Sequence, residues 1–426
     1  METIKPKEFQ WMRLDNAAKI YPFVANVKNS NVFRMSVVMK EPIDAEILKK
    51  AVLDCRERFP AFFVKLRRGL FWYYYDENTK DPLVLPESPY ICQVIIPHRN
   101  NDFLFTFYYY DNRISMEMFH GLSDGTGGFS FLKAVLYRYL ERRGETMLND
   151  GTIMTIDQTP SVSESEDSYN TYFTADPRIK SPFIPAYRIA GKRFISRSGV
   201  GIIAAKVATE ELVNLAKAHG CTVSEYLVTL MYYSIMKTGP KQLLAKRPVA
   251  MTVPINLRKF FPSQSIRNFS LYLSTSIQTP SHGAVFDELL QEVKRQFVRE
   301  RNIPKLQNRL NLNVAFEKTL WIQLLPLFIK NFLFKIGYAV IGDLPYTTSL
   351  SNFGQVDLPD SMAKHVDSFE FNLASGKKKG LAVNSFRGKT SLVFNRCFLD
   401  TALEEMFLAH LGHEGLHVTI QSNEWQ

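Results

Sequence analysis

The segment from Phe119 to Gly128 (FHGLSDGTGG) combines residue types that can do acid–base chemistry with several glycines. His120 follows a segment in which Ile114, Met116 and Met118 alternate with other residues, so the histidine leaves the expected strand on its apolar side. Burial disfavours the imidazolium, which leaves a neutral ring that can accept a proton. The glycines that follow allow a substrate to approach closely. The segment therefore predicts that His120 is a general base.

The competing interpretation is a core histidine whose ring bonds a backbone carbonyl. Asp124 and Gly125 follow His120 at a fixed spacing, in the pattern HxxxDG, and this favours the catalytic interpretation. Ser123 lacks the GxSxG elbow, which argues against a serine hydrolase. The glycines after Asp124 match neither the dinucleotide-binding nor the P-loop fingerprint.

Alternating strands and helices must position this segment. The region 151–195 is rich in proline and serine and has little periodicity, so it predicts a linker or crossover between an N-terminal half (1–150) and a C-terminal half (196–426). The architecture expected is α/β (α+β), with a mixed sheet and flanking helices in each half. Strands are predicted over 34–40, 61–66, 69–75, 103–110, 114–119, 249–254, 270–278, 367–373, 381–386 and 390–394, and helices over 42–55, 126–143, 210–219, 222–237, 286–301 and 401–411.

Composition limits the function classes. The chain has 426 residues, of which 46% are hydrophobic and 22% charged, as in ordinary globular proteins. The net charge of +10 is spread over pairs of basic residues without a stripe or a nucleic-acid-binding motif, so no nucleic-acid partner is expected. Four cysteines without CxxC spacing argue against a disulfide scaffold and a zinc ribbon. His410, His413 and His417 lack a completing ligand set, so neither a metal nor a redox cofactor is implied.

The most apolar stretch is 319–342. Pro326, Lys330 and Lys335 interrupt it, so it does not predict a membrane-spanning helix. A plain buried helix is expected, and the alternative is an amphipathic helix that contacts a membrane peripherally or roofs a pocket. The N-terminal residues carry charge and no apolar h-region, which predicts a cytoplasmic protein.

Two further segments accompany HxxxDG: Val253 to Arg258 (VPINLR), followed by Arg267-Asn268-Phe269, and Ser349 to Gly354 (SLSNFG). Together the three resemble the motifs of the chloramphenicol-acetyltransferase-like superfamily, which includes condensation domains. The resemblance spans nearly the whole chain and is strongest to the bacterial alcohol acetyltransferase branch. It implies two acetyltransferase-like halves with a tunnel between them, which acyl donor and acceptor enter from opposite faces.

The resemblance also implies a mechanism and a set of site residues. His120 deprotonates an alcohol or amine, which attacks the thioester of an acyl-CoA such as acetyl-CoA without an acyl-enzyme. Asp124 pairs with an arginine, for which Arg258 is the candidate, and Gly125 removes side-chain bulk beside the reacting centre. The candidates for structural or oxyanion roles in the other motifs are Arg258, Asn268, Ser349, Ser351 and Asn352. For Ser349 and Ser351, the alternative is a hydroxyl that merely ends a strand.

Two departures narrow the choice of reaction. Phe119 stands where condensation domains carry a second histidine, and the SNFG segment differs from the DFGWG motif of the plant enzymes. The first departure argues against a peptide condensation domain. The acceptor that we expect is an alcohol. The alternatives are transfer to an amine, carrier-protein-dependent condensation on a polyketide or lipid acceptor, or a binding protein that kept the fold and lost the chemistry. Lys377 to Lys379 suit either the 3′-phosphate of CoA or a solvated loop tip.

Overall fold

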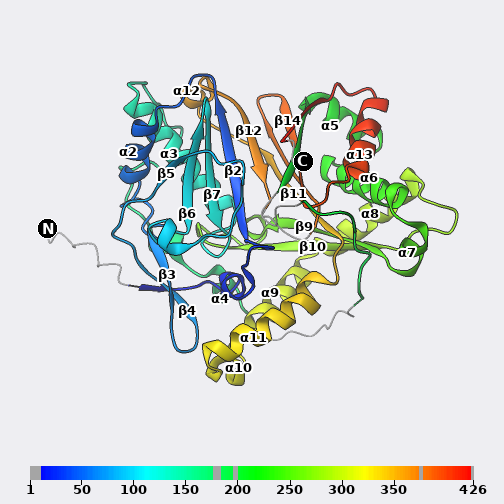
Figure 1. Cartoon of the computed structure of the whole chain (residues 1–426), viewed down its shortest axis with the longest axis horizontal. Coiled ribbons are helices and arrows are strands. Elements are labelled where there is room, and N and C mark those ends of the chain that lie inside the picture. The colour runs from blue at the N-terminus through cyan, green and yellow to red at the C-terminus, as the bar shows by residue number, and fades with distance from the viewer. Residues whose placement is uncertain (1–10, 176–183, 195–199, 374–377, 424–426) are drawn as a thin grey trace.

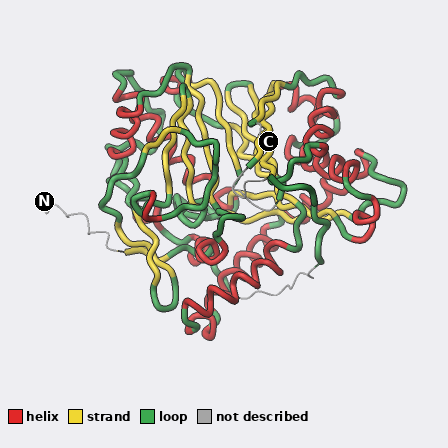
Figure 2. The backbone as a smooth tube through the Cα atoms, viewed as in Figure 1, coloured by secondary structure: helices red, strands yellow, loops and turns green. Residues whose placement is uncertain are grey.

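The first lobe is built on a five-stranded sheet, in the order β12-β2-β7-β6-β5 (Figures 1 and 2). The computed structural model describes residues 11–175, 184–194, 200–373 and 378–423. Helices α2 and α3 pack together beside this sheet (Figure 1), over a core of fully buried phenylalanines that includes Phe62, Phe105 and Phe131. The elements are α2 (Ala45–Asp54), α3 (Gly125–Arg142), β2 (Val32–Met39), β5 (Val84–Pro86), β6 (Phe105–Tyr110), β7 (Arg113–Phe119) and β12 (Val366–Asn372).

The second lobe contains a seven-stranded sheet, in the order β10-β9-β11-β13-β14-β8-β15. Strand β11 runs parallel to β9 and β13, and the other pairs are antiparallel. Helix α6 contacts α8 and α13, and with α5 these helices gather beside the sheet (Figure 1). The elements are β8 (Gly201–Ala208), α5 (Thr209–Ala218), α6 (Val223–Thr238), α7 (Lys241–Lys246), β9 (Val249–Asn256), β10 (Ser270–Ile277), α8 (Phe286–Glu300), β11 (Thr348–Gln355), β13 (Gly380–Phe386), β14 (Lys389–Arg396), α13 (Ala402–His413) and β15 (Thr419–Ser422).

The C-terminal half contributes one strand to the sheet of the first lobe. β12 comes from the region 196–426, yet it pairs with β2 of the first sheet, with Phe369 opposite Val37. Phe369 and Phe371 are buried in the core of the first lobe, which explains why the strand crosses over. The crossover region 151–195 also ties the lobes together, because its Glu164 forms a bidentate ion pair with Arg58 and its backbone bonds Ile266.

Most predicted elements are present. The capping box of Thr222 and Glu225 starts α6, within the predicted helix 222–237. Five strands had no sequence prediction, namely β5, β8, β11, β15 and the short β1 (Trp11–Arg13). β8 contains three alanines and a glycine, and β11 contains serines, asparagine and glycine, so neither has the composition typical of a strand. The surrounding sheet imposes the conformation. The remaining elements are β1 (Trp11–Arg13), η1 (Ala18–Ile20), α1 (Tyr21–Val24), β3 (Val64–Arg68), β4 (Tyr73–Glu77), η2 (Pro97–Arg99), η3 (Val162–Ser165), α4 (Ser168–Thr171), η4 (Leu257–Lys259), α9 (Ile303–Lys318), α10 (Leu320–Leu324), α11 (Leu327–Gly337), η5 (Tyr338–Asp343) and α12 (Asp360–Ala363).

The prediction of a plain buried helix over 319–342 is wrong. Pro326 separates α10 from α11, and both helices expose large apolar side chains on an outer edge of the molecule (Figure 1). Within the described residues, no helix has the length and apolar character needed to cross a bilayer.

Candidate active site

His120 lies immediately after β7, where the first lobe meets the second. Its backbone N–H donates to the carbonyl of Asn31 at 2.7 Å. Its ring stacks on Tyr21, with 4.7 Å between centroids, and meets the edge of Phe33 at 5.3 Å. Burial lowers the pKa of His120, although Asp124 and Asn268 oppose this shift. The imidazole is therefore neutral at pH 7 and can take a proton.

A hydrogen-bonded chain selects the tautomer of His120. Its Nδ1 lies 3.1 Å from Oδ1 of Asn268, and Nδ2 of Asn268 donates to Oδ2 of Asp15 at 3.2 Å. An ionised carboxylate only accepts hydrogen bonds, so the amide nitrogen of Asn268 must face Asp15 and the amide oxygen must face the imidazole. Nδ1 of His120 then carries the hydrogen, and the lone pair that accepts a proton is on Nε2.

Asp15 is fully buried and rigidly held. Its Oδ1 accepts from the backbone N–H of Ala18 at 2.7 Å, and its Oδ2 lies 3.6 Å from Nε of Arg267. Burial raises the pKa of Asp15 to about 6, and the positive charge of Arg267 opposes this rise. The carboxyl is therefore mostly ionised at pH 7, as the chain to His120 requires.

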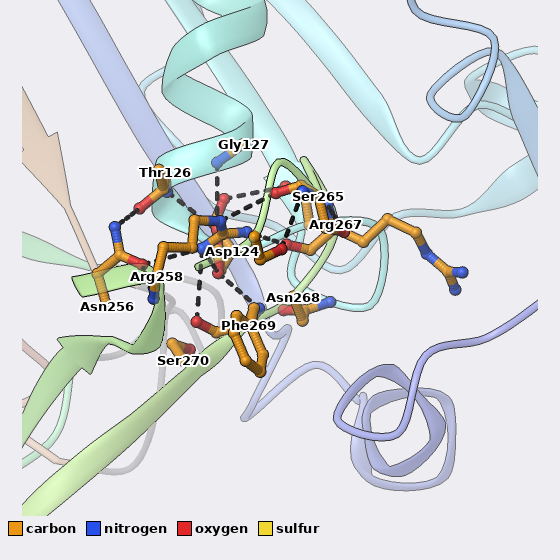
Figure 3. Close-up of polar contacts among 12 residues, drawn as sticks. Asp124, Thr126, Gly127, Asn256, Arg258, Ser265, Arg267, Asn268, Phe269 and Ser270 are labelled. Atoms are coloured by element: carbon orange, nitrogen blue, oxygen red, sulfur yellow. Dashed lines mark hydrogen bonds and ion pairs between the residues drawn. The ribbon is translucent and has the colours of Figure 1, made fainter. Parts of the chain in front are cut away.

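Asp124 uses both carboxylate oxygens inside the protein (Figure 3). Oδ1 caps the first turn of α3 by accepting from the backbone N–H groups of Thr126 and Gly127, both at 3.1 Å. Oδ2 accepts from a guanidinium nitrogen of Arg258 and from the backbone N–H of Phe269, both at 2.8 Å. The predicted pair of Asp124 and Arg258 is therefore present, and it connects the HxxxDG turn to the second lobe.

Arg258 also holds the loop that carries Asn268. Its guanidinium donates to the carbonyls of Ser265 at 2.9 Å and Arg267 at 2.6 Å (Figure 3). The side chain is almost buried, with 11% exposed. The pair of Asp124 and Arg258 thus fixes the loop whose amide orients His120.

Gly125 has a neighbour that the sequence did not predict. A Cβ atom at this position would lie 2.2 Å from the ring of Phe353 in the SNFG segment. Phe353 continues a row of rings through Phe371, at 4.1 Å, and Phe33 to His120. The space freed by the glycine is therefore occupied by an aromatic ring of the chain itself.

The candidate residues of the SNFG segment lie in different surroundings. Ser349 lines a cavity together with Tyr21, whereas Ser351 is buried with 9% of its surface exposed. Asn352 bonds Oγ of Ser224 at 3.0 Å and the backbone N–H of Gly354 at 2.8 Å. The side-chain amide of Asn352 therefore stabilises the local conformation of β11.

The cavity that contains Tyr21 and Ser349 has a volume of about 610 Å³. It lies where η1, α1 and η5 meet β9, β11 and β13, so both lobes contribute to its wall. A smaller pocket of about 240 Å³ shares two of its residues, Tyr346 and Lys378, and is also lined by Arg188 and Arg193. Acidic groups in the wall are limited to Asp343, which pairs with Arg188 and Lys378.

The lysine triplet is not a solvated loop tip over its described part. Lys379 is buried and forms an ion pair of 2.7 Å with the buried Glu404. Lys378 bonds Asp343 and the carbonyl of Tyr346, while Lys377 lies outside the described residues.

Sequence reasoning missed Asp15, Tyr21 and Asn31 as members of the site. Their contacts to the site depend on how the N-terminal segment folds back over β7, and no short spacing pattern encodes that path. The family resemblance, which spans nearly the whole chain, was the only signal that included this segment.

No protein-family model matches the chain, and no curated protein matches it in sequence. Solved structures match over nearly the whole length. Polyketide synthase associated protein 5 from Mycobacterium tuberculosis has a TM-score of 0.60 at 12% identity, covering 95% of this chain and 98% of that one. TRI101 from F. sporotrichioides, complexed with coenzyme A and T-2, has a TM-score of 0.62 at 11% identity, covering 96% and 99%.

A third match is the starter condensation domain of rhizomide synthetase RzmA, a mutant in complex with C8-CoA and Leu-SNAC. It has a TM-score of 0.57 at 11% identity, covering 95% of this chain and 94% of that one. Identities this low establish the fold alone. The chain has the two-lobed, mixed-sheet fold of the chloramphenicol-acetyltransferase-like and condensation-domain proteins, as its three motifs predicted.

Proposed function

We propose that this protein is an acyltransferase that moves an acyl group from the thioester of an acyl-CoA to an alcohol, with His120 as the general base. The observation that carries the proposal is the chain from Asp15 through Asn268 to Nδ1 of His120, because it leaves a proton-accepting lone pair on Nε2. The matched structures support a thioester donor, since two of them were solved with CoA or an acyl-CoA.

The reaction balances with the groups present. Nε2 of His120 takes the hydroxyl proton as the acceptor oxygen attacks the thioester carbonyl carbon. The tetrahedral oxyanion collapses, the carbon–sulfur bond breaks, and the thiolate receives the proton from the imidazolium. Ser349 is the preferred oxyanion donor, because it lines the cavity beside Tyr21.

The donor's charged end has a suitable site in the smaller pocket. Arg188, Arg193 and Lys378 give this pocket three cationic side chains, and it adjoins the cavity that contains Ser349. Phosphate groups favour such clusters of guanidinium and ammonium groups. We assign the CoA phosphates to this pocket and the acyl group to the 610 Å³ cavity.

The test is release of free CoA, followed with a thiol reagent, from acetyl-CoA and longer acyl-CoAs, with an alcohol and an amine offered together. Thiol release should require the acceptor, and mass spectrometry should find the ester as the main product. Amide as the main product would overturn the assignment of an alcohol acceptor. A folded protein that turns over only carrier-linked donors would overturn the assignment of CoA. Binding without turnover of any donor would overturn the proposal of an enzyme.

A further inference from the structure

The helices α10 and α11 carry a row of exposed apolar side chains. At every fourth position from Leu320 to Val340 stands a large apolar residue that is at least 42% exposed. Soluble proteins rarely expose so many large apolar side chains side by side unless the surface binds something. The exposed side chains, which we call the apolar face, are Leu320 (67%), Trp321 (61%), Leu324 (61%), Phe328 (74%), Phe332 (66%), Leu333 (42%), Ile336 (49%) and Val340 (42%).

The opposite side of the same helices is firmly attached to the protein. Phe334 stacks on Phe23 at 4.7 Å, and the ammonium group of Lys330 lies 3.9 Å from the ring of Trp72. Lys330 also donates to the carbonyls of Phe71 and Gln323, at 2.9 and 3.1 Å. These contacts fix the orientation of α11 on the protein. The apolar face therefore points outward because the opposite side of the helix is the packed one.

The turn between β3 and β4 extends this surface. The backbone N–H of Leu327 donates to the carbonyl of Leu70 at 2.8 Å, which brings the turn against the start of α11. Leu70 is 73% exposed and Phe71 is 39% exposed. Figure 1 shows the β3–β4 hairpin and α10 projecting on the same side of the molecule.

The charges beside the apolar face are basic. The stretch from 318 to 342 contains three lysines and no acidic residue, and of these lysines Lys318 and Lys335 are exposed. Arg68, at the end of β3, is exposed as well. Two acidic residues flank this stretch, and both are paired: Glu317 with Lys19, and Asp343 with Arg188 and Lys378. Exposed aromatic and aliphatic side chains with a basic border are typical of helices that lie in the interface of an anionic bilayer.

We infer that α10, α11 and the β3–β4 turn form a docking surface for an anionic lipid bilayer. A second copy of this chain is a poorer occupant, because a two-fold contact through this surface would bring the same cations together. The bilayer satisfies both features, since its acyl region takes the apolar side chains and its phosphates take the cations. Tyr338 and Ala339, which follow α11, also line the 610 Å³ cavity, so the docking surface and that cavity share a wall.

The experiment measures co-sedimentation of the full chain with vesicles of phosphatidylcholine alone or mixed with phosphatidylglycerol. The face variant carries Trp321→Ser, Phe328→Ser and Phe332→Ser. A matched variant carries Leu148→Ser, Leu243→Ser and Val298→Ser, which remove side chains exposed by 72%, 49% and 75% at other places on the surface. Circular dichroism and thermal melting verify that both variants are folded.

We expect wild type and the matched variant to bind the anionic vesicles, and the face variant to bind at least tenfold more weakly. A second variant, Lys318→Gln with Arg68→Gln, should weaken binding to anionic vesicles by about fivefold for each charge removed and leave binding to neutral vesicles unchanged. Equal binding by wild type and a folded face variant would overturn the inference. Wild type that ignores vesicles would overturn it too, and light scattering that then shows a dimer lost in the face variant would assign the surface to self-association.

Discussion

The two sides of the His120 ring are built differently. On the Nδ1 side, Asn268 and Asp15 are buried and bonded to one another, and the loop that carries Asn268 is held by Arg258. Tyr21 covers one face of the ring and also lines a cavity of about 610 Å³. The Nδ1 side, which we call the closed side, fixes the orientation of the catalytic group. The cavity beyond Tyr21, which we call the open side, leaves room for substrates.

This difference predicts where substitutions act. Changes on the closed side should lower stability or kcat, because they disturb groups that are already in place before substrate binds. Changes on the open side should act mainly on KM, because they remove contacts made only to the substrate.

The largest effect should come from Asp124→Ala. This change leaves the nearly buried guanidinium of Arg258 without its partner and removes the cap of α3, so we expect the free energy of unfolding to fall by about 3–5 kcal/mol. Asp44→Ala is the matched control, because Asp44 caps α2 through the N–H of Ile47 and its carboxylate has no ion pair among the described residues. It should cost about 1 kcal/mol. Urea unfolding measures both, and equal losses would show that Asp124 is an ordinary cap.

Asp15→Asn should test the orientation of the His120 ring, because it changes the tautomer and keeps the size of the side chain. The new amide nitrogen would face Nδ2 of Asn268, so the amide of Asn268 turns over and donates to Nδ1 of His120. The proton of the imidazole then moves to Nε2, which can no longer act as a base. We expect kcat to fall at least about a hundredfold, the lower end of what a general base contributes, with KM little changed.

The control for this change is Asp167→Asn. Asp167 accepts from the backbone of Asn16 and from the side chain of Asn170, close to Asp15, and among the described contacts none joins it to Asn268. It should retain the wild-type kcat. A kcat for Asp15→Asn as high as that of the control would show that the chain does not orient His120.

The pH dependence of wild type tests the state of the ring. Burial lowers the pKa of His120 below its ordinary value of 6.5, so the neutral, active form already dominates at pH 7. The acceptor-dependent kcat/KM should be level near neutrality and fall only as the pH drops below 6.5, where the ring becomes protonated. A rate that is already falling between pH 8 and pH 7 would contradict a base that is neutral at pH 7.

The smallest effect should come from the open side. Arg193→Gln removes one cation from the pocket assigned to the CoA phosphates, so the KM for acyl-CoA should rise about fivefold with kcat unchanged. An acyl thioester of N-acetylcysteamine lacks those phosphates and should show no change. Lys241→Gln, an exposed lysine on α7, controls for the loss of surface charge. A rise in KM for both donors would remove the phosphates from this pocket.

The sequence predicted the local parts of this account well. The alternation before His120 and the start of α6 follow from short patterns. The pairing of Asp124 with Arg258, 134 residues apart, was implied by the family resemblance. The crossover of β12, the ring of Phe353 over Gly125 and the carboxylate of Asp15 were not predictable. Each depends on contacts between segments more than 150 residues apart, and no spacing along the chain records them.

Helices α10 and α11 show a second limit of prediction from the sequence, one that concerns local composition. The composition of 319–342 favoured burial, because large apolar residues are usually inside. The structure buries Lys330 and exposes Phe328 and Phe332, since the cation finds carbonyls and the Trp72 ring on the inner side. Hydrophobicity alone could not tell which side of the helix faces the protein.

The central claim is that His120 is the general base, and the most direct measurement compares the rate of acceptor-dependent CoA release by wild type, His120→Ala and His282→Ala. His282 is an exposed histidine paired with Glu288, so its loss removes an imidazole far from the cavity. We expect His120→Ala to lose about 10²–10⁴-fold in turnover while remaining folded, and His282→Ala to match wild type. Equal turnover by His120→Ala and wild type would contradict the account.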